Sequence, residues 1–486
     1  MARTSTRASA LPSRAELPFT ALMLAYLFLV TATFWILKPL KKALFIQYYH
    51  DGVGMLGWQL TAPEAELVAK IANMVVAALA VAVFSQLSRR LRRQALTLTF
   101  TAAFVAAFAA YTRVLPHPGD ATVWSFYLFG DLFSTIMVAT FFAFLNDSVS
   151  PSAAKRLYGP IVLGGVAGGA FGALGLSAAI DRLAPDHWLW ICCGLGLAIA
   201  AIAWAAGRLL GRLPPESRAV DRPPTASQVL ERSGSAALEG ARLVAGSPYL
   251  LSIVGIVGLY EIVSTVMDFQ FTSTVASSFE GPAIGAHLSR VFALTNVVSL
   301  VVQAFVTGFV MTRFGVGVAL LVLPATTFLA SATFLVAPTL WIGSMLNTAD
   351  NGFSYSINQS AKESLYTPTS PEEKYRAKAF IDMFVQRFAK TIGVVASLGM
   401  SRWFHGGESA RWLSLVSIAG IAVWAIAARY AGRCFDEKTG AGGVSEGEHE
   451  ARAPLPRHHV PAHARGGGPL EAPLVLGEVV VGLPRV

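Results

Sequence analysis

The sequence predicts an all-α polytopic membrane protein whose twelve transmembrane helices form two groups of six. Composition indicates the class: of 486 residues, 54% are hydrophobic and only 14% are charged, whereas about 25% of the residues of an ordinary soluble domain are charged. The apolar residues gather into runs close to the roughly 20 residues that a helix needs to cross a bilayer. A polar segment divides these runs into two equal sets, which predicts the two groups.

Twelve apolar runs are expected to be membrane spans, numbered one to twelve in chain order. They are residues 19–37, 63–86, 94–112, 122–145, 157–180, 187–209, 248–275, 288–312, 315–336, 338–359, 379–401 and 410–432. Residues 19–209 and 248–432 therefore form two six-helix bundles. The polar segment between them, 210–247, is expected to be a linker with one short surface helix. Residues 1–18 form an N-terminal segment, and the Gly-, Pro- and charge-rich residues 433–486 are expected to be a disordered tail.

Lysine and arginine residues gather in the loops on one side of the predicted membrane. These loops contain Arg14, Arg89, Arg90, Arg92, Arg93, Lys155, Arg156, Lys374, Arg376, Lys378 and several arginines of the linker. Because positively charged loops are retained in the cytoplasm, both termini are expected to be cytoplasmic. The net charge of +9 is explained by these loops and by helix ends, so no nucleic-acid partner is expected.

Three lysines break this rule, because Lys38, Lys41 and Lys42 sit at the end of span one that should face outward. If the helix continues, their spacing puts all three on one side of it. A charge at membrane depth costs roughly 2.5 to 3.5 kcal/mol on insertion scales, so it usually faces a functional cavity. The alternative interpretation is that the three side chains reach out to the membrane interface.

Other charged residues recur in every third span. Asp131 lies in span four, Glu261 and Asp268 lie two turns apart in span seven, and Asp350 lies in span ten, followed by Lys362 and Glu363. Spans two, three, five, six, nine and twelve are nearly free of central charge. Packing or capping is the alternative role for Asp131, and structural pairing is the alternative for the acids of span seven. The glycine-rich stretch 164–169 is expected to serve close helix packing.

The period of three helices predicts two halves that are each built from inverted three-helix repeats. A weak sequence echo supports this prediction. Asn146 precedes AKRLYGP (154–160), and Asn358 precedes AKESLYTP (361–368), at corresponding ends of spans four and ten. The pattern favours the major-facilitator architecture.

Residues 358–393 carry a long motif, NQSAKESLYTPTSPEEKYRAKAFIDMFVQRFAKTIG. Its characteristic positions are Lys362, Glu363, Tyr366, Pro368, Arg376, Lys378, Ile381, Asp382, Lys390 and Gly393. The motif resembles that of the nucleotide transporter family, the ATP/ADP translocases of plastids and obligate intracellular bacteria with their bacterial relatives. The resemblance is strong around 355–393 and extends weakly over 19–432. It implies a nucleotide carrier in the inner membrane of a bacterium.

The resemblance also implies a set of substrate-binding residues. Lys41 and Lys362 fall on the family's two essential lysines, and Asp131 and Asp268 fall where the family commonly has glutamate. Supporting roles are expected for Lys38, Lys42, Glu261, Glu363 and Lys390. The sequence departs from the family at Pro39 and Lys42, which replace two aspartates that flank the lysine of span one. This change places the ATP/ADP specificity in question.

The expected function is exchange of ATP and ADP, or of other phosphorylated anions, by alternating access. Lysine binds phosphate as a compact point charge, and the carboxylates of spans four and seven are expected to pair with the lysines when no substrate is present. The alternatives are a major-facilitator carrier of another small solute, with or without proton coupling, and a non-transporting membrane protein. Membrane lipids are expected partners and a monomer is the expected state. No enzymatic activity, cofactor or metal is expected.

Overall fold

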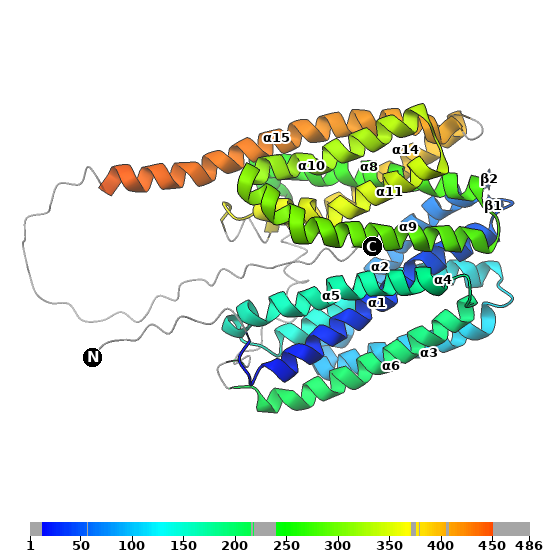
Figure 1. Cartoon of the computed structure of the whole chain (residues 1–486), viewed down its shortest axis with the longest axis horizontal. Coiled ribbons are helices and arrows are strands. Elements are labelled where there is room, and N and C mark those ends of the chain that lie inside the picture. Colours follow the sequence, from blue (N-terminus) through cyan, green and yellow to red (C-terminus); the bar gives the residue numbers. More distant parts are fainter. Residues whose placement is uncertain are drawn as a thin grey trace, which may run out of the picture.

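The computed structural model describes residues 12–55, 57–214, 217, 240–370, 376–378, 380–404 and 408–450. Long helices dominate these residues and lie in two groups side by side (Figure 1). The group from the first half of the chain contains α1 (Leu17–Tyr48), α2 (Ala62–Arg90), α3 (Arg93–Val114), α4 (Asp120–Asn146), α5 (Pro151–Ala179), α6 (Pro185–Leu209) and the short 3-10 helix η1 (Leu210–Arg212).

The group from the second half is interrupted by three π-helical segments, η3, η4 and η5. Its elements are α8 (Pro248–Ser278), α9 (Pro282–Val301), η3 (Val302–Thr307), α10 (Gly308–Val336), α11 (Leu340–Phe353), η4 (Ser354–Asn358), α12 (Gln359–Ser364), η5 (Ile381–Val385), α14 (Gln386–Trp403) and α15 (Glu408–Glu450). Single π-helical turns inside α-helices are frequently found at functional sites.

The two ends of the molecule are named here by their landmarks. The hairpin side carries the antiparallel pair β1 (Val53–Met55) and β2 (Trp58–Leu60), which follows α1. The linker side is the opposite end, where α6 ends and α8 begins (Figure 1).

Nine helical stretches in the described residues are long and apolar enough to cross a membrane. One of them, Pro282–Val336, is 55 residues long and reverses at Gly315, whose φ of 82° lies in the left-handed region that glycine adopts without strain. Within the described residues, each predicted span falls on helical structure, although some of the helices extend beyond their spans. The all-helical membrane class is therefore confirmed, whereas the count of twelve spans stays a prediction.

The first helix is longer than its predicted span. It passes through Pro39 and ends at Tyr48, so the three lysines lie inside it and not at its end. A proline removes one helical hydrogen bond, but α4, α5, α6 and α9 pack against this helix and support its continuation.

The predicted boundary of the C-terminal tail is also corrected. α15 continues beyond Arg433, because Cys434 and Phe435 pack against the core of the second half and the ammonium group of Lys438 lies 5.3 Å from the Tyr249 ring centre. Residues 240–246 of the linker are helical. Residues 451–486 and 218–239 lie outside the described residues, and the other domain boundaries stay predictions.

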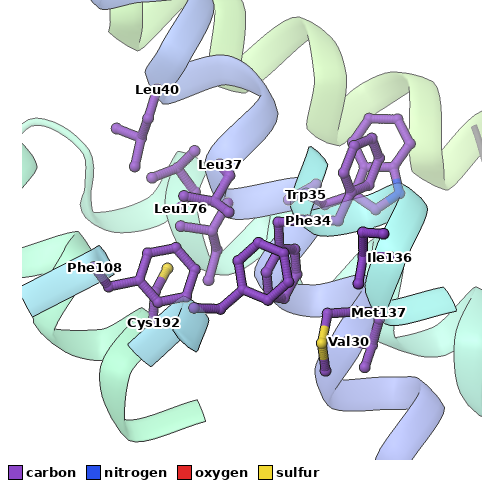
Figure 2. Close-up of a cluster of buried hydrophobic side chains, with 14 of the residues drawn as sticks. Val30, Phe34, Trp35, Leu37, Leu40, Phe108, Ile136, Met137, Leu176 and Cys192 are labelled. Atoms are coloured by element: carbon purple, nitrogen blue, oxygen red, sulfur yellow. The ribbon is translucent and has the colours of Figure 1, made fainter. Parts of the chain in front are cut away.

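α1 runs through the middle of the first group of helices. Its apolar side chains meet residues from α3, α4, α5 and α6 in one continuous core (Figure 2). The labelled members of this core are Val30, Phe34, Trp35, Leu37, Leu40, Phe108, Ile136, Met137, Leu176 and Cys192. The position of the three lysines on α1 is thus set by packing on several sides.

A buried carboxylate ties the start of α1 to α5 on the linker side. Glu16 accepts hydrogen bonds from Arg156 (2.7 Å), from the Ser217 hydroxyl (2.8 Å) and from the backbone N–H of Ser13 (2.8 Å). Burial by itself raises the pKa of this carboxyl group, but the donors outweigh it and lower the pKa of Glu16 to about 2. The carboxylate is therefore ionised at neutral pH and holds the two helices together.

Glycines on one face of α5 let its backbone touch α1. A Cβ atom at Gly164, Gly168 or Gly172 would lie 2.6, 2.1 or 2.4 Å from a carbonyl oxygen of α1. The hydroxyl of Thr31 also donates to the carbonyl of Gly165 across this contact, at 2.8 Å. The predicted role of the glycine-rich stretch in close helix packing is confirmed.

We expect Gly168→Ala to destabilise the protein by about 1 to 3 kcal/mol, because the added methyl group would force the two backbones apart. Gly175→Ala on the same helix is the matched control. No atom lies within 4 Å of a Cβ at that position, so alanine should be neutral or stabilise by up to about 1 kcal/mol. Thermal unfolding in detergent measures both variants, and equal unfolding temperatures would contradict the packing argument.

Candidate functional site

Two of the lysines on α1 are buried and paired with carboxylates. Lys41 and Lys42 are each only 5% exposed. Lys41 forms an ion pair with Asp131 of α4, and its ammonium group lies 4.4 Å from the Tyr127 ring centre. Lys42 donates hydrogen bonds to both carboxylate oxygens of Asp268 on α8, at 2.9 and 3.1 Å. The second pair joins the two halves of the protein.

Two charged residues of α2 complete this group. Glu66 lies 3.2 Å from the Lys42 ammonium and accepts a hydrogen bond from the Tyr127 hydroxyl at 3.0 Å. Lys70 donates to Asp268 and lies 3.8 Å from Glu66. The prediction that span two is nearly free of central charge was therefore wrong. The i, i+4 spacing of Glu66 and Lys70 within an apolar run was the signal that could have found them.

Lys38 is the fourth lysine at this site. Its ammonium group lies among aromatic rings, 4.7 Å from the ring centre of Trp35, 5.2 Å from Phe292 and 5.9 Å from Tyr355. No carboxylate of the described residues lies within 4 Å of it. We call Lys38, Lys41, Lys42 and Lys70, together with Glu66, Asp131 and Asp268, the lysine cluster.

The lysine cluster has one more cation than carboxylates when every member is ionised. Cation–π attraction to the surrounding rings stabilises the surplus ammonium group of Lys38. A site of this kind, buried between helices of both halves, has the charge needed to attract an anion.

The geometry of these residues bears on the alternatives that the sequence left open. Burial and direct pairing of Lys41 and Lys42 argue against the interpretation that they reach out to the interface. Asp131 lies eleven residues after the first residue of α4, so it does not cap that helix. Asp268 bonds lysines of α1 and α2, so its partners come from the other half.

The remaining predicted site residues lie elsewhere. Glu261 and Lys390 face each other across α8 and α14, with 3.8 Å between their charged groups. Glu363 pairs with Lys378 at 2.7 Å. Lys362 lies on α12, twelve residues after Asp350, which is roughly 18 Å along a helix axis toward the linker side. Its substrate-binding role stays a prediction.

Contacts on the hairpin side join the two halves beyond the lysine cluster. Arg402 of α14 donates to the carbonyl of Gln59 in the hairpin at 2.9 Å and lies 4.9 Å from the Trp58 ring centre. Gln47 at the end of α1 donates to the carbonyl of Gly281 at 2.7 Å. Asp181 and Arg290 form an exposed ion pair at 2.7 Å. These are the hairpin-side contacts in the text below.

The fold and the buried charged site define a class, a polytopic carrier of the major-facilitator fold. The chain superposes on the crystal structure of a mutant of the nucleoside transporter NupG with a TM-score of 0.59 and 13% identity, over 85% of this chain and 99% of that one. An auto-inhibited POT family peptide transporter gives a TM-score of 0.56 with 13% identity, over 90% and 99%. At such low identity these likenesses show the fold alone.

The chain belongs to the TLC ATP/ADP transporter family, whose model matches residues 120–340 and 333–435. It is 23% identical to ADP,ATP carrier protein 2 of Chlamydia trachomatis over 430 residues, 74% of this chain and 79% of that protein. It is also 23% identical to ADP,ATP carrier protein 1, chloroplastic, of Arabidopsis thaliana over 344 residues, 63% of this chain and 54% of that protein. The chain thus spans about half the length of the Arabidopsis relative. The predicted family resemblance and the carrier class are confirmed.

Neutralising one partner of the Lys41–Asp131 pair should destabilise the protein strongly. Removing one member of a buried ion pair typically costs about 3 to 5 kcal/mol, because the other charge stays buried without a partner. We expect this loss for Asp131→Asn and a partial recovery for the double variant Lys41→Met/Asp131→Asn. Thermal unfolding in detergent, arranged as a double-mutant cycle, measures the coupling.

Asp181→Asn is the control for this cycle, since it makes the same chemical change in an ion pair whose side chains are 61% and 59% exposed. Such a pair contributes less than about 1 kcal/mol. Equal stability of the Asp131→Asn protein and the parent would show that the buried pair does not constrain the fold.

Proposed function

We propose that the protein is an antiporter that exchanges nucleotides, or related phosphorylated anions, across the membrane by alternating access. The observation that carries the proposal is the lysine cluster, in which four ammonium groups and three carboxylates lie between the two halves and Lys41, Lys42 and Glu66 are buried. The names of the ADP,ATP carrier relatives make ATP and ADP the first substrates to test.

Phosphate groups suit this cluster chemically. They carry several negative charges, and each lysine offers a compact cation with three hydrogen-bond donors. The three carboxylates already satisfy Lys41, Lys42 and Lys70 when no anion is bound. A phosphate that takes the place of Asp268 would keep those donors satisfied and would also neutralise the surplus charge of Lys38.

Exchange follows from where these ion pairs lie. Asp268 belongs to the second half, whereas its partners Lys42 and Lys70 belong to the first. Without substrate, the pairs hold the halves together. The movement that turns the empty site from one side of the membrane to the other is therefore slow. A bound phosphate releases Asp268 from its lysines, which lowers the barrier for the movement of one half against the other.

Alternating access also requires contacts that form on one side of the site at a time. The hairpin-side contacts join loops and helix ends of the two halves through single hydrogen bonds and exposed charges. Individually weak contacts of this kind are suited to break and form again during transport.

A second candidate is a carrier of another anionic solute that is coupled to protons. The buried carboxyl group of Asp350, which lies outside the lysine cluster, favours this candidate.

We expect Lys41→Ala to raise the apparent dissociation constant for ATP about tenfold to a hundredfold, because one charge-assisted contact contributes roughly 1.5 to 3 kcal/mol. Lys41→Arg should retain part of the exchange. The measurement is uptake of labelled ATP into proteoliposomes loaded with ADP, corrected for the amount of folded protein. Lys438→Ala, which removes an exposed lysine from α15, should exchange like the parent. Normal ATP exchange by the Lys41→Ala variant would refute the assigned role of this lysine.

The proposed orientation places both termini and the linker side in the cytoplasm of a bacterium whose inner membrane holds the monomeric protein among its lipids. In a Cys434→Ser background, an impermeant thiol reagent added to intact cells should label Gly54→Cys in the hairpin but not Thr439→Cys in α15. The buried residues Cys192 and Cys193 should stay unreactive. The opposite labelling pattern would reverse the orientation.

A further inference from the structure

Among the residues that the structure describes, no cation lies directly beside one buried carboxyl group of the second half. Asp350 on α11 is 2% exposed. Its Oδ2 atom accepts a hydrogen bond from the Ser264 hydroxyl of α8 at 2.6 Å. Within the described residues, its Oδ1 atom has no hydrogen-bond partner, and no lysine, arginine or histidine nitrogen lies within 4 Å of the carboxyl group. The three carboxylates of the lysine cluster, by contrast, are each paired directly with a lysine.

The groups around Asp350 favour a neutral side chain. Glu261 and Asp268 on α8 are negative, and Lys38 on α1 is the positive group whose field reaches it. The phenols of Tyr260 and Tyr355 are neutral. On α9, His287 forms a hydrogen bond with Ser344 of α11 at 2.8 Å, nearly two turns before Asp350. The sole charged residue of α10 is Arg313, which is exposed at the linker side. Lys390 of α14 faces Glu261.

An ionised carboxylate in this place would lose its hydration without gaining an ion pair, whereas the protonated acid is neutral and gains a donor. We propose that Asp350 is a proton-binding site of the carrier, and that proton binding there is coupled to anion binding in the lysine cluster. The coupling rests on the proposed carrier function, but proton binding by Asp350 does not.

The lysine cluster and Asp350 are connected through two elements. Ser264, which holds the carboxyl group, precedes Asp268 by one turn of α8. Tyr355 follows Asp350 in η4, and its ring centre lies 5.9 Å from the ammonium group of Lys38. An anion in the cluster neutralises the positive field of Lys38, which otherwise favours the ionised form of Asp350. The loaded carrier therefore binds the proton more tightly.

Linkage then requires the reverse effect. If the anion strengthens proton binding, protonation strengthens anion binding by the same factor. The loaded carrier should carry a proton together with its anion, and affinity for the anion should rise by up to about tenfold for each unit that the pH falls.

Proton uptake on addition of ATP to the purified full-length protein, in weakly buffered solution with a pH dye, tests the coupling. The parent protein should take up protons and bind ATP more tightly at lower pH. Asp350→Asn should bind ATP with nearly pH-independent affinity and take up fewer protons. Asp436→Asn, the same change at an exposed position of α15, corrects for protons bound by ATP itself and should behave like the parent. Equal proton uptake by the Asp350→Asn and Asp436→Asn proteins would overturn the coupling.

Infrared difference spectra of the protein without substrate test the proton site alone. The difference between spectra recorded at about pH 5 and at about pH 9 should contain the C=O stretching band of a carboxyl group that is protonated at the lower pH and ionised at the higher. Asp350→Asn should lose this band, and Asp436→Asn should retain it. Ser264→Ala, which removes the hydrogen bond to Oδ2, should move the titration of the band to higher pH. A band unchanged by Asp350→Asn would refute the proton site. The site would also be refuted if ATP binding depended on sodium ions and not on pH, and if Asp350→Asn abolished that sodium dependence. Failure to bind ATP would refute the nucleotide assignment and leave the infrared result standing.

Discussion

The buried ion pairs of the lysine cluster are the interaction on which the rest of the structure depends. Charged side chains at membrane depth are tolerated only when partners or a polar cavity offset their loss of hydration. Lys41 and Lys42 stand on adjacent positions of α1, so their partners have to approach from different directions. Asp131 comes from α4, and Asp268 comes from α8 in the other half. The placement of these helices around α1 follows from the need to pair both lysines.

Close packing of α1 supports that arrangement. The glycine face of α5 brings its backbone against α1 at three positions one turn apart, and the aromatic core of α3 and α4 covers another side. Glu16 fixes the first residues of the helix to α5 on the linker side. A helix held at its start and along its length presents its lysines at defined positions, which a site for small anions requires.

The ionic groups of the two halves have different characters. The first half contributes the lysines and two of the carboxylates, whereas the second half contributes Asp268 to the cluster and keeps Asp350 apart from it. Interfaces with ion pairs that a ligand is able to replace are suited to two discrete arrangements of the halves. The proposed exchange of anions and the proposed link to a proton both rest on this division.

Composition and the spacing of apolar residues predicted the helical membrane class, the two halves and the packing role of residues 164–169, because these depend on local pattern and on the thickness of the bilayer. The charged residues Lys41, Lys42, Asp131 and Asp268 were also identified from the sequence as candidate residues of the functional site. The sequence also predicted that these carboxylates pair with the lysines, but only the tertiary structure decided that Asp131 pairs with Lys41 and Asp268 with Lys42. The contribution of Glu66 and Lys70 and the isolation of Asp350 were likewise decided only by the tertiary structure. The physical reason is that an ion pair depends on a few ångströms between helices that are distant in the chain, and no periodicity within one helix specifies that distance.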